Sequence, residues 1–505
     1  MDPEELSRAL SALSALPVDD PVRLRVERVA ESFVRDGRRR RQKEQRLRRE
    51  AADRAVLAAS ATGAAGRRED AALAVPAAGM LAVADQVTAA SAPAIGHTVQ
   101  RLDTRSGGSA VADEAAAERA QVIGPANQQV EVPLVAPGMS DQAADSVGTL
   151  SRPRRCYVCK HHFTEVSAFY HQLCPACAAE NLAWRSARTP LDGRRALVTG
   201  GRVKIGFQVA LMVLRDGAAV RVVTRFPHDA VRRFRAVEDS AKWLDRLTVT
   251  GLDLRDPRQV VELCDELLAA GEPLDVLINN AAQTVRRPES SYAPLIAADR
   301  QAAAELGGGL RELAPIAGYR GARADSVPHS PELAVDENGL LPDPSPRNSW
   351  SAELGELDAV ELLEVHLVNA VAPALLADRL LPLMTSSPFP RRYIVNVTAV
   401  EGRFEVRNKT AGHPHTNMAK AALNMLTRTS AEALARRGVY LSSVDTGWIT
   451  DEKPMPSKTR HAEAGFRTPL DIIDGAARIY HPIVSGENGE PLFGVFLKDY
   501  RAVAW

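Results

Sequence analysis

Apolar and polar residues alternate along the C-terminal part of the chain in a rhythm that predicts strands and helices in turn. From Thr189 to Trp505, short apolar runs are separated by helical stretches of mixed polarity. Such runs are typical of strands that are buried on both faces of a sheet. The predicted strands are Arg195–Thr199, Val220–Thr224, Leu247–Leu252, Val276–Asn279, Tyr393–Thr398, Val439–Val444 and Leu492–Phe496. This order predicts stacked βαβ units, and therefore an α/β fold with a doubly wound parallel sheet covered on both faces.

One segment interrupts the rhythm of the large domain, residues 189–505. Residues 286–350 are rich in Pro, Gly, Ala, Asp and Glu and show no sustained alternation of strand and helix patterns. A connection of this length inside a compact domain is either functional or mobile. We interpret the segment as an insertion over the edge of the sheet.

The first 150 residues follow a different pattern. Residues 1–60 are predicted to be a helical basic segment, with a break at Pro17 to Pro21. The run Arg38–Glu50 carries eight bases and two acids. We interpret it as a solvated helix face, and a phosphate-binding or localisation patch is the alternative. Residues 61–150 are dominated by small and polar residues, which cannot bury enough apolar area to fold, so we predict a disordered linker.

Composition excludes several classes of protein. The chain of 505 residues has 63 basic and 63 acidic side chains, which argues against a globally basic nucleic-acid binder. We find neither a secretory signal nor an apolar run of about 18 residues that a membrane helix needs. Five cysteines in so long a chain do not make a disulfide scaffold. We therefore expect a cytoplasmic protein that does not bind a membrane.

Four of the cysteines form a separate module at residues 151–188. Cys156 and Cys159 make one CxxC pair, and Cys174 and Cys177 make a second pair after fourteen intervening residues. Four thiolates complete the closed tetrahedral shell that structural zinc prefers. An iron–sulfur cluster and dithiol redox chemistry are the alternatives. A closed zinc site leaves no position for a substrate, so we expect a brace for the next domain or a docking site for a protein partner. His161, His162 and His171 are interpreted as surface or packing residues, and Cys264 as a core residue.

The first strand of the large domain leads into a glycine turn. Thr199 to Gly206 follows the strand and opens an amphipathic helix. Glycines let the backbone approach a pyrophosphate, which the N–H groups of the helix receive, as in Rossmann-like dinucleotide sites. The next strand ends at Arg225, where an acid would bind a ribose hydroxyl. Because an arginine suits a 2′-phosphate, with Lys204 as a second cation, the sequence favours NADP(H) over NAD. A solvated strand-end charge is the alternative for Arg225.

With these motifs, residues 189–505 resemble the short-chain dehydrogenase/reductase family. The matching motifs are Thr199–Gly206 for the glycine turn, Asp253-Leu254 for the adenine contact, Asn279–Ala282 after the fourth strand, Val368–Pro373 for the asparagine helix, Ile394–Thr398 before the serine position, Lys420 for the lysine of YxxxK, and Val444–Gly447 for the loop after the sixth strand. Lys204, at a glycine position of the turn, resembles the branch that prefers NADPH. The resemblance also implies a homo-oligomer.

The resemblance assigns roles to individual residues. It implies that the cofactor contacts come from Thr199, Gly200, Lys204, Ile205, Gly206, Arg225, Asp253, Leu254, Asn280, Ala281, Lys420 and Thr450. It also implies that Asn369 belongs to the catalytic group and that Lys420 binds the nicotinamide ribose.

The catalytic positions depart from the family pattern. Thr416 occupies the position of the tyrosine of YxxxK, and Ala399 that of the serine. An aliphatic hydroxyl is a far weaker acid than a phenol, so Thr416 alone cannot supply the proton that a reduction needs. The neighbouring imidazoles titrate near physiological pH, and we consider His415 first, then His413 and His366, as replacement donors.

Two functions fit this sequence. The first is an NADP(H)-dependent oxidoreductase acting on a carbonyl or alcohol, in which Asn369, Thr416, Lys420 and His415 form the catalytic group. The second is a catalytically silent NADP(H)-binding sensor or scaffold that uses the zinc module to dock partners. The absence of a basic recognition helix after the cysteines argues against a nucleic-acid binder.

Overall fold

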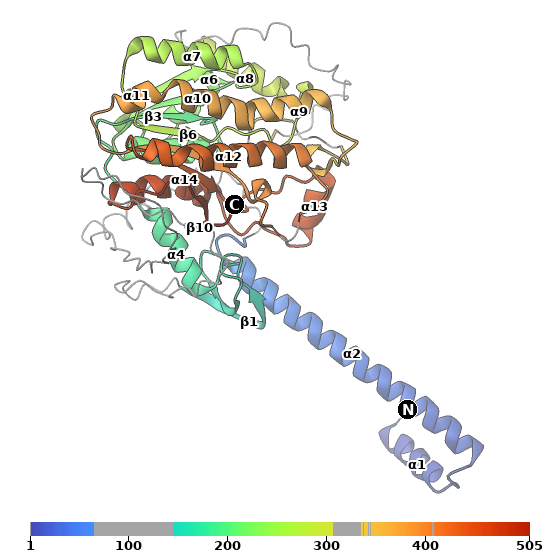
Figure 1. Ribbon diagram of the computed structural model, residues 1–505. Helices are drawn as coiled ribbons and strands as arrows, with labels where there is room; N and C mark the ends of the chain where they lie inside the picture. The colour runs from blue at the N-terminus through green and yellow to red at the C-terminus, as the bar shows by residue number, and fades with distance from the viewer. Residues whose placement is uncertain are drawn as a thin grey trace, which may run out of the picture.

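The computed structural model describes residues 2–64, 145–306, 335–336, 338–341, 343, 345–406 and 409–505. Most of the predicted linker and the middle of the predicted insertion lie outside these residues. The described chain comprises a large α/β domain, a small module that contains the four cysteines, and a helical N-terminal arm (Figure 1).

The large domain is built on a sheet of eight strands in the order β10-β9-β8-β7-β6-β3-β4-β5 among the described residues. These strands are β3 (Arg195–Thr199), β4 (Ala219–Thr224), β5 (Leu247–Gly251), β6 (Val276–Asn279), β7 (Arg392–Thr398), β8 (Val439–Asp445), β9 (Phe496–Lys498) and β10 (Arg501–Val503). Neighbouring strands are parallel except for the β9–β10 pair. The strand order reverses between β3 and β6, where open α/β sheets bind their ligands. The predicted doubly wound fold is confirmed.

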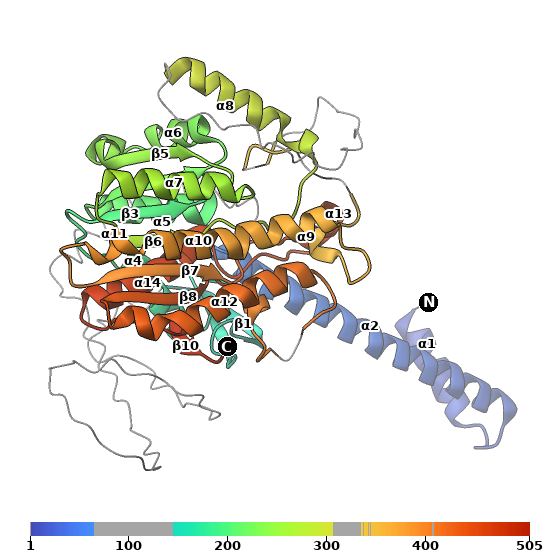
Figure 2. The same ribbon diagram turned by 45° about the horizontal axis from the view of Figure 1, so that its top comes forward.

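Helices cover both faces of this sheet (Figures 1 and 2). One face carries α7 (Pro257–Ala270), α9 (Ala359–His366), the π-helical turn η6 (Leu367–Val371), α10 (Ala372–Arg379), α11 (Leu381–Thr385) and α12 (Pro414–Ala435). The other face carries α5 (Lys204–Arg215), α6 (Pro227–Arg235) and α14 (Ile472–Glu487). Buried aliphatic side chains fill the space between the sheet and the helices on both faces. Cys264, a residue of α7, is buried in this core, as predicted.

By length and composition alone, one helix of the described chain is apolar enough to cross a membrane. It is the continuous run Ala359–Arg379, which joins α9, η6 and α10. In the structure this run packs against α7 and α12 over the sheet. A core helix of a domain passes the same test.

The cysteine module joins a two-stranded antiparallel sheet to one helix. Its elements are β1 (Ser146–Arg155), β2 (His162–Ser167) and α4 (Pro175–Ser186). The module shares one hydrophobic core with the α5 and α14 layer of the large domain. Arg185 Nη1 forms ion pairs with Asp471 at 2.6 Å and with Asp474 at 2.9 Å, and both acids lie at the start of α14. These contacts fix the module against the large domain.

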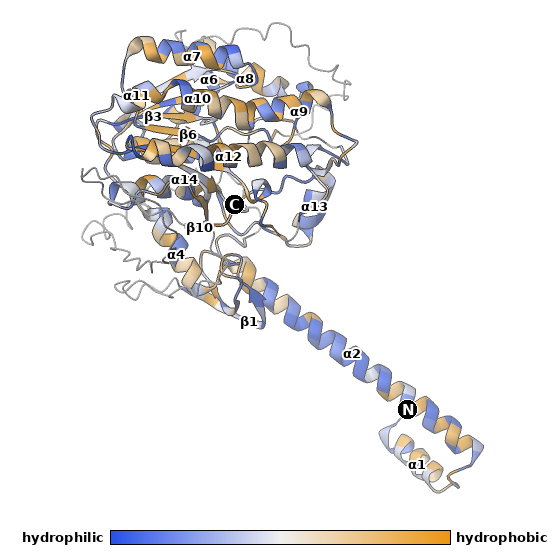
Figure 3. Cartoon of the chain, in the orientation of Figure 1, coloured by the Kyte–Doolittle hydropathy of each residue, from blue (hydrophilic) through white to orange (hydrophobic). Residues whose placement is uncertain are grey.

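The N-terminal arm consists of α1 (Pro3–Ser14) and α2 (Pro21–Ala59), with the predicted break between them. Both helices begin at an aspartate cap, Asp2 and Asp20. Figure 1 shows α2 projecting away from the large domain, and Figure 3 shows that its middle is hydrophilic. The last turns of α2 contact the module, where Asp53 Oδ1 accepts a hydrogen bond from Ser151 N at 2.7 Å.

The described parts of the predicted insertion flank the open edge of the domain. They include the turn η4 (Glu289–Tyr292), α8 (Ala293–Leu306), which packs against α6, and the turn η5 (Ser349–Ser351). The remaining short elements are η2 (Ser240–Lys242), η3 (Leu244–Arg246), η7 (Val400–Gly402) and the helix α13 (Met455–Glu463).

Candidate active site

The glycine turn between β3 and α5 is packed too closely for side chains at two positions. Gly200 has a φ of 70°, and a Cβ there would lie 2.9 Å from Ala281 Cα. A Cβ on Gly206 would lie 2.3 Å from both Gly200 O and Asn280 Nδ2. Lys204 adopts the left-handed region with a φ of 52°, which is uncommon for a residue other than glycine. The turn is thus held in one conformation by backbone contacts.

Thr199 and Asn280 fasten this turn to the end of β6. Thr199 Oγ1 accepts hydrogen bonds from Asn280 N at 3.1 Å and Ala281 N at 3.0 Å. Asn280 Nδ2 donates to Thr199 O at 3.0 Å and to Gly200 O at 3.3 Å. The sequence motif placed these residues against the cofactor, and in the structure their side chains shape the turn that would hold it.

The first N–H groups of α5 are directed toward the crevice at the strand-order reversal. Val203, the N-cap residue, provides no side-chain hydrogen bond to them. A helix start without a side-chain cap offers N–H groups and a positive dipole end to a phosphate. Ile205, beside this start, packs against α14, where a Cβ on Gly475 would lie 3.0 Å from Ile205 Cδ1. This helix start is the place where the sequence motif predicts the pyrophosphate.

Arg225 lies at the end of β4, where the sequence places a 2′-phosphate contact. Its Nη2 lies 3.4 Å from Tyr292 OH, and its guanidinium lies 5.0 Å from the Tyr292 ring. No carboxylate of the described chain pairs with Arg225. By contrast, the nearby Arg202 is ion-paired with Asp229 at 2.6 Å. The positive charge of Arg225 also helps to lower the pKa of Asp253 at the end of β5.

The predicted adenine-contacting residues lie at the end of β5. Leu254 is buried, and the Asp253 carboxylate accepts a hydrogen bond from Arg255 Nη2 at 2.6 Å. Burial alone would raise the pKa of Asp253, but the Arg255 guanidinium outweighs it and lowers that pKa. Arg255 also reaches Glu364 of α9 at 3.3 Å. This ion-pair network ties the adenine side of the crevice to the helix that carries Asn369.

Asn369 is positioned by an irregular turn. It lies in η6, where the helix widens to the π form, a feature often found at functional sites. Its side chain pairs with the backbone of Gln283, because Gln283 N donates to Asn369 Oδ1 at 2.7 Å and Asn369 Nδ2 donates to Gln283 O at 3.0 Å. The segment after β6 is thereby fixed to the catalytic helix.

Lys420 is fully buried at the centre of the candidate catalytic group. Its Nζ donates to Val397 O at 2.8 Å, which is its one hydrogen bond among the described residues. Burial lowers the pKa of Lys420 to about 8, with partial compensation from Glu401. An ammonium with a pKa this close to neutrality can release its proton under physiological conditions.

Two buried hydroxyls near Lys420 have no hydrogen-bond partner. They belong to Thr416, one helical turn before Lys420, and to Thr398, the last residue of β7. Buried polar groups are normally satisfied, so orphan hydroxyls indicate a missing ligand or water. Among the described residues, no tyrosine hydroxyl bonds to Lys420, and Ala399 follows Thr398.

His415 points to a different neighbour. Its Nε2 lies 3.5 Å from Glu361 Oε1 of α9, within ion-pair distance, and its buried Nδ1 has no hydrogen-bond partner among the described residues. Although burial opposes the effect, His415 and Ser349 lower the pKa of Glu361. Burial and the neighbouring His415 also lower the pKa of His366.

His413 lies at the mouth of the same region and is held by the insertion. Its ring stacks on Trp350 at 3.8 Å, and its Nδ1 donates to Trp350 O at 2.9 Å. Burial is the main cause that lowers the pKa of His413. The end of the insertion thus covers the start of α12, as expected for a segment near a substrate pocket.

The loop after β8 completes the rim. Asp445 Oδ1 accepts from Gly447 N at 2.8 Å, and Asp445 Oδ2 accepts from Val400 N at 2.6 Å. Thr450, the predicted contact to the nicotinamide amide, donates its hydroxyl to Glu452 Oε1 at 2.6 Å. The predicted site residues from β3, β4, β5, β6, α12 and this loop all lie at the carboxyl edge of one sheet.

The four cysteine sulfurs of the module lie within 4.8 Å of one another. Cys174 N donates to Cys156 Sγ at 3.3 Å, and hydrogen bonds from Cys174 and Cys177 lower the pKa of Cys156. His171 is buried and contacts Thr62 at 2.8 Å, while His161 and His162 are exposed. The predicted ligand set is therefore assembled, and its geometry fits one tetrahedral ion.

Sequence reasoning missed three side chains of this region. Glu361 and Arg202 meet their partners across long stretches of sequence, so no local spacing could reveal them. Tyr157, from the cysteine module, reaches the loop after β8, where Trp448 N donates to its hydroxyl at 2.9 Å. Because Tyr157 lies between Cys156 and Cys159 in the sequence, its position did not indicate a contact outside the module.

Comparison with known proteins identifies the family. A short chain dehydrogenase family model matches residues 194–296, and an enoyl-(acyl carrier protein) reductase model matches residues 345–467. An uncharacterized protein of Acanthamoeba polyphaga mimivirus is 34% identical over 348 residues, covering 65% of this chain and 71% of that protein. A short-chain dehydrogenase of Neurospora crassa is 28% identical over 174 residues, 33% of this chain and 61% of its own length.

A solved structure of a short chain dehydrogenase from Burkholderia cenocepacia in complex with NADP aligns with 22% identity and a TM-score of 0.41. It covers 61% of this chain and 97% of the Burkholderia chain. Only the middle of the insertion separates the two family models, which match in order along the sheet whose carboxyl edge carries the glycine turn, Asn369 and Lys420. The chain belongs to the short-chain dehydrogenase/reductase family.

Proposed function

We propose that the chain is an NADP(H)-dependent oxidoreductase that interconverts a carbonyl and an alcohol, with Lys420 as the source of the proton. The observations behind this proposal are the buried Lys420 ammonium and the hydroxyls of Thr416, one helical turn before it, and Thr398, which are buried without a hydrogen-bond partner. When bound, the cofactor supplies the hydride. The chain must supply a proton to the oxygen of the reduced substrate.

Thr416 connects Lys420 to that oxygen. It lies four residues before Lys420 on the same helix, so both side chains share one face of α12. With substrate bound, the Thr416 hydroxyl would give its proton to the substrate oxygen and take one from the Lys420 ammonium, which leaves a neutral amine. The two groups are not hydrogen-bonded in this structure, so the step requires them to come into contact when substrate and cofactor bind. This transfer needs no strongly acidic hydroxyl on Thr416, because its proton is replaced as it leaves.

The cofactor is proposed to be the phosphorylated dinucleotide. Gly200, Gly206 and the helix start of α5 fit the pyrophosphate, and Arg225 has no carboxylate partner in the described chain. An unpaired guanidinium suits the dianionic 2′-phosphate. The Asn369 side chain is hydrogen-bonded to the backbone of Gln283 and so holds the segment after β6 in place.

His415 is the second candidate donor, because its ring is buried, its Nδ1 has no hydrogen-bond partner among the described residues and its Nε2 lies beside Glu361. It lies five residues before Lys420, about 140° away around the helix at 100° per residue. His415 therefore faces α9, whereas Thr416 and Lys420 lie on a shared face. This placement favours Lys420 over His415.

A test of the proposed function combines binding with turnover. NADPH fluorescence titration should show saturable binding, and a panel of aldehydes and ketones should show oxidation of NADPH at 340 nm. Binding without turnover across the panel, together with new turnover in a Thr416→Tyr variant, would instead establish the silent sensor or scaffold. Absence of binding at millimolar NADPH would contradict both functions.

We also propose that the four cysteines hold one structural zinc ion. Four sulfurs in one shell leave no open position, so the ion would fold the module and take no part in the reaction. Metal analysis of the purified protein should give about one zinc per chain. A Cys174→Ser variant should lose the metal. A Cys264→Ser variant should keep it, because Cys264 lies on α7 and is buried in the core of the large domain.

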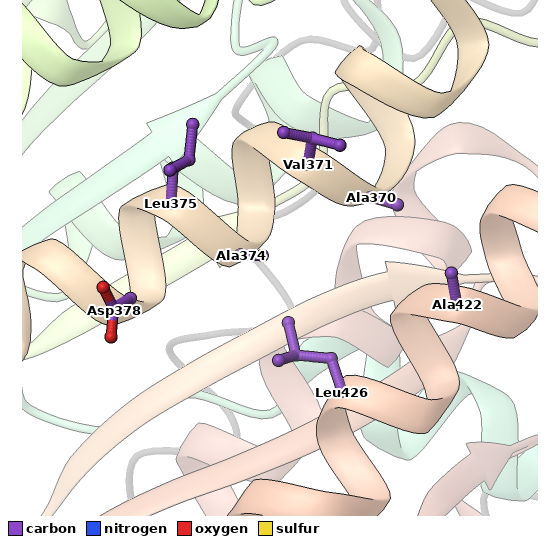
Figure 4. A pocket seen from close by; sticks show the side chains of 7 residues that line it. All are labelled: Ala370, Val371, Ala374, Leu375, Asp378, Ala422 and Leu426. Carbon is purple, nitrogen blue, oxygen red and sulfur yellow. The ribbon is translucent and has the colours of Figure 1, made fainter. Parts of the chain in front are cut away.

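A second copy of the chain is the proposed partner for the apolar face formed by α9, η6, α10 and α12. Figure 4 shows a groove that is lined by η6 and α10 on one side and by α12 on the other, and its volume is about 470 Å³. Its lining residues are Ala370, Val371, Ala374, Leu375, Asp378, Ala422 and Leu426. Leu363, Met418 and Met425 are also exposed on these helices. Two such faces related by a twofold axis would bury each other.

The oligomeric state tests this assignment. Light scattering should give a dimer or larger assembly, and Met425→Glu should dissociate it. The matched control is Met455→Glu, because Met455 is an exposed methionine on α13, away from this face. A monomeric parent protein would contradict the assignment.

A further inference from the structure

We propose that the cysteine module helps to shape the candidate active site, because its Tyr157 is a positioning residue for the loop after β8. The Tyr157 hydroxyl accepts a hydrogen bond from Trp448 N at 2.9 Å across 291 positions of sequence. This inference rests on the proposed function, because that function gives the loop its importance.

The loop contacted by Tyr157 joins two parts of the candidate site. It begins at Asp445, whose carboxylate accepts hydrogen bonds from Gly447 N and from Val400 N. Val400 follows Ala399, directly after the end of β7. It continues through Trp448 to Thr450, the predicted contact to the nicotinamide. A shift of this loop would therefore move both the cofactor contact and the segment beside Lys420.

The backbone of the loop needs support at this point. Gly447 has a φ of 83°, and a Cβ there would lie 2.5 Å from Leu470 Cδ1 and 3.5 Å from Tyr157 OH. Trp448 is 40% exposed and its ring packs on Phe466 at 5.0 Å, whereas Ile449 beside it is buried in the core. The Tyr157 hydroxyl thus holds the backbone N–H of the most exposed residue of the loop.

Tyr157 is itself held by the turn that carries the first cysteine pair. Cys156 N donates to His161 O at 2.8 Å, and Tyr157 N donates to Gln172 O at 2.8 Å, next to the second pair. An ion bound by the four sulfurs would lock these two segments together. The position of the phenol is therefore coupled to the integrity of the sulfur cluster.

A lysine and a carboxylate reinforce the same contact. Lys498 Nζ lies 5.7 Å from the centre of the Tyr157 ring and 3.2 Å from Asp445 Oδ1. Lys498 thus bridges the phenol of the module and the acid at the start of the loop. Tyr157 approaches the site as a support for the loop, and its neighbour is Lys498 rather than Lys420.

The rest of the docking surface keeps the module in place without touching this loop. Tyr170 OH donates to Asp474 Oδ1 at 2.5 Å, and Arg185 pairs with Asp471 and Asp474 at the start of α14. Tyr170 is therefore a matched control, because it is a second tyrosine whose hydroxyl joins the module to the large domain.

The test is hydrogen exchange of residues 446–450, combined with NADPH titration, in the full-length parent, Tyr157→Phe and Tyr170→Phe proteins. We expect exchange of this segment to rise about two- to tenfold in Tyr157→Phe and to stay at the parent value in Tyr170→Phe. The dissociation constant for NADPH should rise by a similar factor in Tyr157→Phe alone. Removing metal from the parent with a chelator should raise exchange in the same segment.

The exchange measurement needs no cofactor, so it separates this inference from the proposed function. Unchanged exchange of residues 446–450 in Tyr157→Phe, or equal changes in both variants, would overturn the positioning role. Failure of the parent to bind NADPH would overturn the proposed function, while the exchange result would still decide whether Tyr157 holds the loop.

Discussion

The two halves of the candidate site are built in different ways. The cofactor half, at β3, β4 and β6, depends on backbone approach, with Gly200 and Gly206 packed too tightly for any side chain. The proton-donor half, at β7 and α12, depends on single side chains, and there the sequence has Thr416 and Ala399 at the positions that the family resemblance gives to the phenol and the serine. We propose that the first half is retained while the second is rebuilt.

This difference shows that cofactor binding and proton supply are separable. A close backbone contact tolerates almost no substitution, because a Cβ on Gly206 would meet atoms at 2.3 Å. A proton donor can be replaced by any group of suitable pKa that reaches the same oxygen. Burial lowers the pKa of Lys420 to about 8, and in the proposed function this group supplies the proton.

The largest expected effect is that of Lys420→Met, which removes the proton source. We expect the rate of carbonyl reduction to fall about 10²- to 10⁴-fold, the usual contribution of a general acid, while the fold is kept. Steady-state kinetics at saturating NADPH measure this change. Lys43→Met is the control, since Lys43 is exposed on α2. Equal rates in the two variants would show that Lys420 has no part in the reaction.

The cofactor half is tested by Arg225→Ala. Loss of a charge-assisted contact to the 2′-phosphate should weaken NADPH binding about 10- to 100-fold and leave NADH binding unchanged. Fluorescence titration with each cofactor gives the two dissociation constants. Arg235→Ala, an exposed arginine on α6, should change neither constant. A parallel loss for NADPH and NADH would mean that Arg225 supports the fold rather than the phosphate.

The smallest effect is expected for His415→Gln. The variant keeps a polar side chain near Glu361, and the turnover rate should change by less than about tenfold, below the usual contribution of a general acid. Rates must be compared per folded molecule, because His415 is buried. A loss of 10²-fold or more with unchanged NADPH affinity would assign the proton to His415 and weaken the case for Lys420.

Local sequence patterns predicted the framework well. β3 and β6 have the predicted bounds, because each is a buried apolar run between turn residues. The last strand was misplaced, since Phe496–Lys498 pairs with β8 and the hairpin strand β10 follows it, whereas Leu492–Phe496 was expected. The apolar run there begins before the strand, and Gly494, with a φ of 66°, interrupts it.

The site was predictable only where a motif is contiguous. The glycine turn and the residues around Lys420 lie in short segments, so their spacing could be read directly. The Glu361–His415 pair and the Tyr157–Trp448 contact join elements that are far apart in the sequence. Burial is also invisible in a motif, so the lowered pKa of Lys420 emerged only once β7 and α12 were packed together.

The dependence of the reduction rate on pH tests the central claim most directly. An acid must be protonated to act, so a donor with a pKa of about 8 is active below that pH and is lost above it. At saturating NADPH and carbonyl substrate, the rate should be constant up to about pH 8 and then fall tenfold per pH unit. A break near pH 6.5, the ordinary range of an imidazole, or a rate that stays constant up to about pH 10, would contradict Lys420 as the donor.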